Sequence, residues 1–239
     1  MAHLIVLLLA TFAFAAPASA DGKTKAKPPT LVIGSPRKNT LDRVKLELFP
    51  DTRRTRVLLT LAISKPATDR RSRRPDSVDL QLPDTARVAG LAITVGTRQR
   101  IAAKVNLASA APTELWERFF DLKQEEVDTA LLQFSYDRDG AAHYDVYFSP
   151  LVQGAPVTIE IEIELEPTRQ LDVSSVRAVA DYVVEIDTAV QKVKPLPERS
   201  KAQRIALPKP KPDDSATHPL IRDSTVLRRV SLLVGASTN

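Results

Sequence analysis

The densest group of side chains with binding chemistry is a run of arginines. Arg70, Arg71, Arg73 and Arg74 lie close together, and a second arginine cluster occupies 53–56. Guanidinium groups bind carboxylates and phosphates through paired hydrogen bonds. The run is therefore the candidate binding site for an anionic partner, such as an acidic cell-surface polymer, a lipid headgroup or an acidic protein. A solvated loop that aids solubility is the alternative. Nucleic acid is not an expected partner, because no aromatic residue interleaves with the arginines.

A second set of reactive side chains surrounds a histidine. His143, Asp145 and Tyr147 occupy alternate positions, which places them on one face of a strand. Such a trio suits acid–base or metal chemistry, but a surface histidine on a partly covered face is the favoured interpretation. The sequence has no nucleophile elbow, phosphate-binding glycine loop or Cys/His ligand spacing. The sequence predicts a protein that is not an enzyme, with no catalytic residues and no cofactor.

Acidic residues offer two metal-binding alternatives. Glu160, Glu162 and Glu164 share one face of an alternating segment, and we expect arginine or lysine partners on neighbouring strands. An acidic metal-binding face is the alternative. The segment 137–140, Asp-Arg-Asp-Gly, resembles part of a calcium loop but lacks the further oxygen ligands and the distal glutamate. No metal site is predicted.

The elements that position these groups are mostly strands. Apolar residues alternate with polar ones at 43–49 and at 157–165, while 56–64 is rich in β-branched and aliphatic residues. The aromatic-rich runs 131–136 and 142–148 flank an Asp-Gly pair, a strong signal for a hairpin. The fold class predicted is therefore mainly β.

One helix is predicted from Pro112 to Lys123, because its apolar residues recur at helical spacing. It carries Trp116, Phe119 and Phe120. We interpret this aromatic cluster as packing of the helix on a sheet, and the alternative is an exposed aromatic platform for a ligand.

The first residues have the features of a secretory signal peptide. Leu4 to Ala16 is apolar and uncharged, and Ala18-Ser19-Ala20 suits signal peptidase. We therefore expect cleavage before Asp21 and a periplasmic or extracellular protein. The apolar run is too short to span a bilayer comfortably, and no later segment reaches transmembrane length, so no transmembrane anchor is expected. The chain has no Cys, so its core must hold without disulfides.

The composition then divides the chain into five parts. We expect a signal peptide at 1–20, a flexible Lys-rich leader at 21–30, a β-domain at 31–193, a Pro-rich linker at 194–219 and an apolar C-terminal segment at 220–239. Two alternatives stay open for the apolar residues 220–234. They add an edge strand either to this domain or to a partner's sheet. His218 lies in the tail, where no rigid site is expected.

Segments of the middle zone share motifs with a known family. They are Leu82–Gly96, Trp116-Glu117, Asp128–Gln133, Phe148–Gly154 and Val157–Leu165. In this order the chain resembles the VIT domain, the module of vault proteins and inter-α-trypsin inhibitor heavy chains. The resemblance implies an antiparallel β-sandwich with one inserted helix, 65–76 as an insertion, and no catalytic residues.

The chain departs from that family after the domain. A von Willebrand A domain commonly follows, whose metal site needs Asp-x-Ser-x-Ser, whereas residues 172–176 read Asp-Val-Ser-Ser-Val. Cation-dependent adhesion is therefore not carried over. The leading hypothesis is an exported, non-catalytic protein-interaction module with an unidentified protein partner. The alternative is a structural, envelope-associated protein that binds anionic surface polymer or lipid through its Arg-rich loop.

Overall fold

The computed structural model of the chain describes most of the domain but not every residue. The described residues are 28–34, 41–64, 75–83, 85–98, 100–102, 105–106, 112–124, 128–136, 142–150, 154–191, 195–198, 201–209 and 232–235. The predicted signal peptide, the arginine run 70–74, the turn 137–140 and His218 lie outside them.

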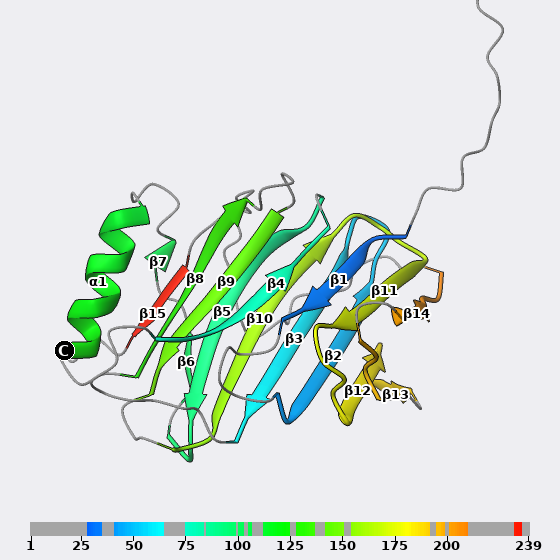
Figure 1. The fold of residues 1–239 in the computed structure, drawn as a ribbon. Coiled ribbons are helices and arrows are strands. Elements are labelled where there is room, and N and C mark those ends of the chain that lie inside the picture. The colour runs from blue at the N-terminus through cyan, green and yellow to red at the C-terminus, as the bar shows by residue number, and fades with distance from the viewer. Residues whose placement is uncertain are drawn as a thin grey trace, which may run out of the picture.

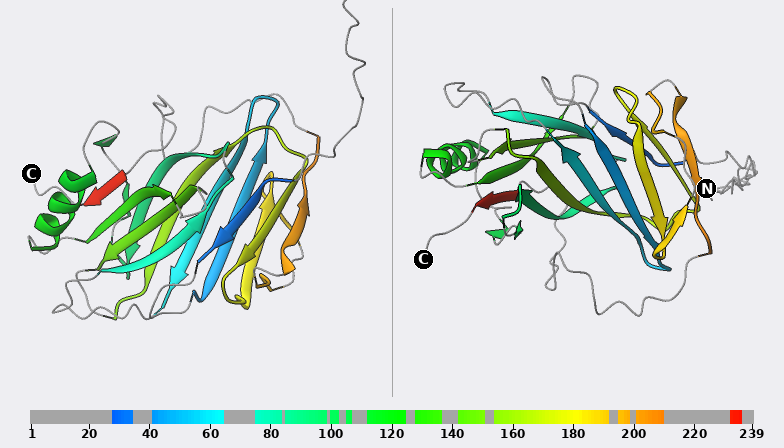
Figure 2. Two further views of the ribbon diagram at one scale, coloured as in Figure 1. Left: turned by 45° about the horizontal axis from the view of Figure 1, so that its top comes forward. Right: turned by 90° about the horizontal axis from the view of Figure 1, so that it is seen from below.

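The described chain forms two β-sheets that stack face to face, with one helix beside them (Figures 1 and 2). The eight-stranded sheet has the order β14 (Gln203–Ala206), β11 (Gln170–Ser175), β1 (Thr30–Ile33), β4 (Asp76–Gln81), β9 (Ala142–Ser149), β8 (Thr129–Tyr136), β15 (Leu232–Gly235) and β7 (Val105–Asn106). The seven-stranded sheet has the order β13 (Ala189–Gln191), β12 (Asp181–Ile186), β2 (Arg43–Pro50), β3 (Thr55–Ile63), β10 (Val157–Leu165), β5 (Arg87–Val95) and β6 (Ile101–Ala102). The predicted mainly β sandwich with one helix is confirmed.

The alternating sequences place one face of each central strand in the core. β10 lies between β3 and β5, with Ile161 opposite Leu59 on one side and Leu91 on the other. All three side chains are buried. Their counterparts across the sandwich include Val78 of β4 and Val146 of β9, both fully buried. Because strand side chains alternate, the charged residues of the same strands face outward.

Most neighbouring strands run antiparallel, but two pairs are parallel. β1 runs parallel to β11, with Thr30 opposite Asp172, and β2 runs parallel to β12. The predicted hairpin is present as the antiparallel pair β8–β9, in which Tyr136 lies opposite Ala142. The two sheets are therefore mixed rather than wholly antiparallel.

The domain extends beyond the end expected at residue 193. The segment 194–219 was expected to be a linker, yet β14 within it pairs with β11 through Ile205 and Leu171. Leu196 and Leu207 are also buried. The described residues 195–198 and 201–209 are thus part of the sandwich, because alternating apolar side chains in a Pro-rich segment still pack into the core.

The helix α1 (Pro112–Gln124) packs against the β8 side of the eight-stranded sheet (Figure 2). Phe119 is fully buried, and the Trp116 ring centroid lies 4.6 Å from that of Tyr147 on β9. Trp116 also stacks on Phe120 at 5.5 Å. These contacts confirm the interpretation of the aromatic cluster as packing between helix and sheet. β15 pairs with β8, so residues 232–235 add a strand to this chain's own sheet.

Candidate functional site: a groove beside the first strand

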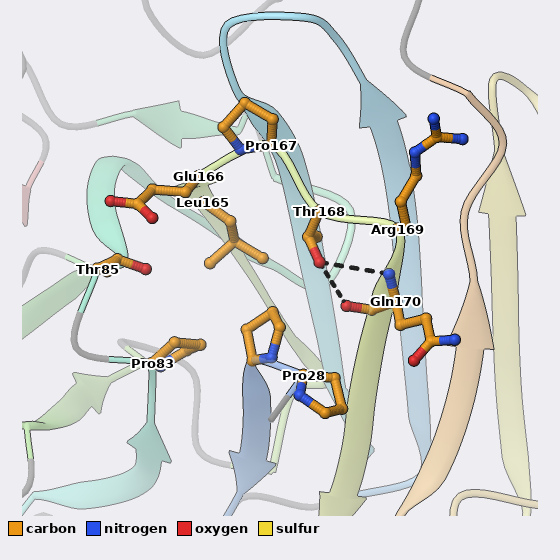
Figure 3. A pocket seen from close by; sticks show the side chains of 10 residues that line it. Pro28, Pro83, Thr85, Leu165, Glu166, Pro167, Thr168, Arg169 and Gln170 are labelled. Atoms are coloured by element: carbon orange, nitrogen blue, oxygen red, sulfur yellow. Dashed lines mark hydrogen bonds between the residues drawn. The ribbon is translucent and has the colours of Figure 1, made fainter. Parts of the chain in front are cut away.

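A groove opens at the end of the sandwich where β4 and β10 end (Figure 3). Its cavity volume is about 510 Å³, within the range of ligand-binding clefts. The lining residues are Pro28, Pro29, Pro83, Thr85, Leu165, Glu166, Pro167, Thr168, Arg169 and Gln170. They come from the start of β1, the β4–β5 connection and the β10–β11 turn. Leu165, which is buried, is the last residue of β10 in the seven-stranded sheet.

The walls of the groove are held in place by local hydrogen bonds. The Ala86 N–H donates to the Pro83 carbonyl at 2.8 Å, which closes the β4–β5 turn. On the other side, the Thr168 hydroxyl lies 2.7 Å from the Gln170 carbonyl. Proline rings fix the backbone φ angle at four lining positions. The groove is therefore preformed, which lowers the entropic cost of binding.

The backbone hydrogen bonds of β1 alternate between its two neighbouring strands, β11 and β4. The Pro29 carbonyl accepts from the Asp172 N–H at 2.9 Å, and the Ile33 carbonyl accepts from the Val176 N–H at 2.9 Å. These residues therefore direct their polar backbone groups toward β11. Gly34 N–H donates to the Asp79 carbonyl at 2.5 Å, so the even-numbered residues direct theirs toward β4.

Thr30, the first residue of β1, follows Pro28 and Pro29, which line the groove. β1 pairs with β4 through Val32–Gln81 and Ile33–Leu80. The same register, continued, places Thr30 opposite Pro83, which has no N–H to donate and whose carbonyl accepts from Ala86. Among the described residues, no backbone hydrogen bond reaches Thr30 from this side. The β1–β4 pairing therefore stops short of Thr30, beside the groove.

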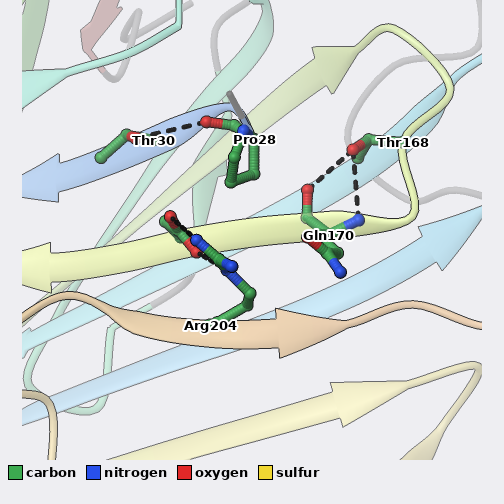
Figure 4. A network of polar contacts seen from close by, with 6 residues as sticks. Pro28, Thr30, Thr168, Gln170 and Arg204 are labelled. Carbon is green, nitrogen blue, oxygen red and sulfur yellow. Dashed lines mark hydrogen bonds and ion pairs between the residues drawn. The ribbon is translucent and has the colours of Figure 1, made fainter. Parts of the chain in front are cut away.

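Two charged side chains flank the groove. In Figure 3, Glu166 extends toward Thr85, whereas Arg169 extends away from Leu165 and Pro83. Behind the groove, Arg204 on β14 binds both carboxylate oxygens of Asp172 at 2.9 and 3.1 Å (Figure 4). Asp172, the first residue of the segment 172–176, is therefore engaged in an ion pair.

The second arginine cluster is only partly available for binding. Arg54 forms an ion pair with Glu164, and Arg56 lies over the Phe49 ring at 5.7 Å from its centroid. Arg53 is exposed in the turn between β2 and β3. The proposed binding residues Arg70, Arg71, Arg73 and Arg74 lie outside the described residues, so their placement stays a prediction.

The acidic face of β10 behaves as an internal charge network. Glu164 pairs with Arg54, and Glu160 pairs with Arg100. The expected arginine partners are present, but they lie just outside strands, with Arg54 before β3 and Arg100 before β6. Glu162 between them is 5% exposed, and burial raises the pKa of its carboxyl, while the nearby Arg56 opposes that rise.

His143 lies on the outer face of the eight-stranded sheet, as predicted. Its Nδ1 is 3.0 Å from the Asp79 carboxylate, and its side chain is 18% exposed. Asp145 and Tyr147 share this face, whereas Tyr144 on the opposite face is buried. Throughout the described part of the chain, no three His, Cys, Asp or Glu side chains are placed to hold a metal ion.

The sequence did not single out the groove, since its residues come from three separate segments. One signal was present: Pro28, Pro29, Pro83 and Pro167 all lie just outside strands. Proline at such positions ends backbone pairing, but sequence alone does not show that these ends meet.

Comparisons with known proteins add no relative. A scan against protein-family models finds no match, and a search of curated proteins finds no similar sequence. The resemblance to the VIT domain therefore stays a prediction. Within the described residues, no helix has both the length and the apolar character needed to cross a bilayer.

Proposed function

We propose that this chain is an exported, non-catalytic protein-interaction module, a VIT-like sandwich that binds a polypeptide in the groove beside β1. One observation carries the proposal: a preformed groove of about 510 Å³, with four proline rings in its lining, opens where the β1–β4 pairing stops. Surface grooves beside a sheet are a common site of peptide recognition.

The shape and lining of the groove favour a polypeptide over a small molecule. Four of its ten lining residues are prolines, which supply apolar rings and no backbone donor. Small-molecule sites usually bring several polar groups to one point. Here the polar groups are spread along the groove, from Thr85 to Gln170.

Site-specific photo-crosslinking tests this function. A photoreactive phenylalanine replaces Thr85, which is exposed at the groove, and in a control variant it replaces Val190, which is 66% exposed on β13. After exposure to envelope extract, we expect polypeptide adducts at position 85 that are missing at position 190. Equal adducts at both positions, or none at 85, would overturn the groove as the binding site.

N-terminal sequencing of the exported chain, with Asp21 expected first, tests export.

An anionic polymer or lipid is the second candidate partner, favoured by the strand topology at the opposite end of the sandwich. Asp42 N–H donates to the Ala62 carbonyl at 2.9 Å, and the Asp42 carboxylate accepts from the Ser64 N–H. The segments 35–40 and 65–74 thus have neighbouring flanks. Their sequences contain one acidic residue, Asp69, and seven basic residues: Arg37, Lys38, Lys65, Arg70, Arg71, Arg73 and Arg74.

Heparin-agarose is a suitable anionic polymer probe for this second candidate. We expect the change of all four arginines at 70, 71, 73 and 74 to alanine to lower the salt concentration needed for elution. Arg53→Ala at the groove end serves as a control for loss of an exposed charge. Elution of the fourfold variant at the wild-type salt concentration would refute the Arg-rich loop as the site.

A further inference from the structure

We infer that two copies of this chain pair through β14, whose outer edge joins antiparallel to the same strand of a second copy. The inference goes beyond the proposed function and does not involve the groove. It rests on the direction of the backbone groups of β14, on the exposure of that edge and on the register in which β14 matches itself.

The outer edge of β14 carries backbone groups that have no partner among the described residues. β14 ends the eight-stranded sheet, with β11 as its neighbour on the inner side (Figure 1). Leu207 N–H donates to the Arg169 carbonyl at 2.8 Å, so the odd-numbered residues direct their backbone groups toward β11. Because successive residues alternate in direction, Arg204 and Ala206 direct their N–H and C=O away from the sheet. In the described part of the chain, no backbone hydrogen bond reaches them from that side.

This edge is accessible and held in the extended conformation. Ala206 is exposed, and the side chain of Arg204 is 57% exposed. Ile205 between them is buried and packs into the core, which fixes the strand. Pairing therefore costs little ordering entropy on either side. A strand edge of this kind is a template for pairing with another chain.

The register in which β14 pairs with itself satisfies the outward groups. Two identical antiparallel strands are related by a two-fold axis. An axis at Ile205 places Arg204 of each copy opposite Ala206 of the other, and each such pair exchanges both of its backbone hydrogen bonds. The two Ile205 side chains then lie beside each other on the core face, so the apolar layer continues from one copy into the next.

The charges of β14 are compatible with this register. Arg204, the charged residue of the strand, binds both carboxylate oxygens of Asp172 at 2.9 and 3.1 Å, and across the axis it faces an alanine. Pro208 has no N–H, so the pairing ends before it. Lys201 of one copy and Lys209 of the other lie beyond the paired residues and repel each other. Salt screens that repulsion, so we expect it to strengthen the association.

Sedimentation velocity of the exported chain measures the association. The strand pair is a small interface, so we expect a reversible dimer that forms between about 10 µM and about 1 mM. Ala206→Pro removes the outward N–H and leaves the β11 pairing, which uses the neighbouring residues, so this variant should stay monomeric. Ala206→Val keeps the N–H and should dimerise like the wild type. An unfolding midpoint close to that of the wild type shows that each variant folds.

Engineered cysteines test the register, because the chain has no Cys of its own. A chain with Arg204→Cys is mixed with a chain with Ala206→Cys under mild oxidation, and mass spectrometry detects the mixed disulfide. Residues opposite each other in a sheet lie within the distance that a disulfide spans. A matched mixture of Lys201→Cys with Ala206→Cys, which the register keeps apart, should give little mixed disulfide. Equal yields from the two mixtures would overturn the register.

Hydrogen exchange separates a second copy from other occupants of the edge. The amides of Arg204 and Ala206 should exchange rapidly in dilute solution and slowly where the dimer forms. Slow exchange at both concentrations would show that another segment of the same chain covers the edge. Rapid exchange at both would leave the edge to a partner of different sequence. Either result, or a dimer that persists in Ala206→Pro, would overturn the inference, while crosslinking at position 85 tests the groove separately.

Discussion

Residues 194–209 should be essential for stability, although their sequence resembles a linker. A chain that ends at Val193 loses the buried side chains of Leu196, Ile205 and Leu207 and the β14–β11 pairing. Burial of each such side chain contributes about 1.5–3 kcal/mol, so the loss is on the order of 5–9 kcal/mol. That is comparable to the whole free energy of unfolding of a typical domain, about 5–15 kcal/mol. We therefore expect this chain to be largely unfolded.

Urea unfolding followed by far-UV circular dichroism checks the prediction. The matched control is a chain that ends at Lys209, because both truncations remove β15 and only the shorter one removes 194–209. The point variant Leu196→Ala, at a fully buried position, should cost about 2–5 kcal/mol in the whole chain. Equal urea midpoints for the two truncated chains would show that the segment is a linker after all.

Three further substitutions should change the stability of the fold, each in a direction set by local geometry. Thr188 has a φ of +69° in the two-residue turn between β12 and β13, so Thr188→Gly should raise the unfolding midpoint by removing about 1 kcal/mol of backbone strain. In Gly34→Ala the added Cβ would lie 2.7 Å from the Asp79 carbonyl oxygen, so calorimetry should show about 1–3 kcal/mol of destabilisation. Burial raises the pKa of Glu162, so the folded chain holds that proton more tightly than the unfolded chain, and this carboxyl destabilises the fold above its folded pKa. Glu162→Gln should therefore raise the midpoint at pH 7 and have less effect as the pH falls through that pKa; a lower midpoint at pH 7 would contradict this reasoning.

The central strands and the helix were accessible from the sequence because their signals are local. The run Val157–Leu165 alternates strictly, and the structure has β10 over those same residues. α1 begins at Pro112, as predicted, because its apolar residues follow helical spacing. The hydrophobic pattern alone indicates which face of each element is buried.

The rest of the fold depends on contacts between residues far apart in sequence. β14 is four residues long, and its position as a strand depends on β11, which a short Pro-flanked segment does not reveal. The groove likewise lies where the β1–β4 pairing stops, a relation set by register. Periodicity shows that a strand exists but not which neighbour it takes.

The parallel pairs of the two sheets have a consequence for how the chain folds. Thr30 of β1 lies opposite Asp172, and Arg43 of β2 lies opposite Asp181. The first strands therefore cannot pair until the strands near the end of the domain are available. Such distant pairings are slow to form, because a long loop must close before any contact is gained. A chain interrupted before β11 cannot complete the eight-stranded sheet. If the chain is exported unfolded, slow folding keeps it unfolded during translocation until its last strands have crossed the membrane.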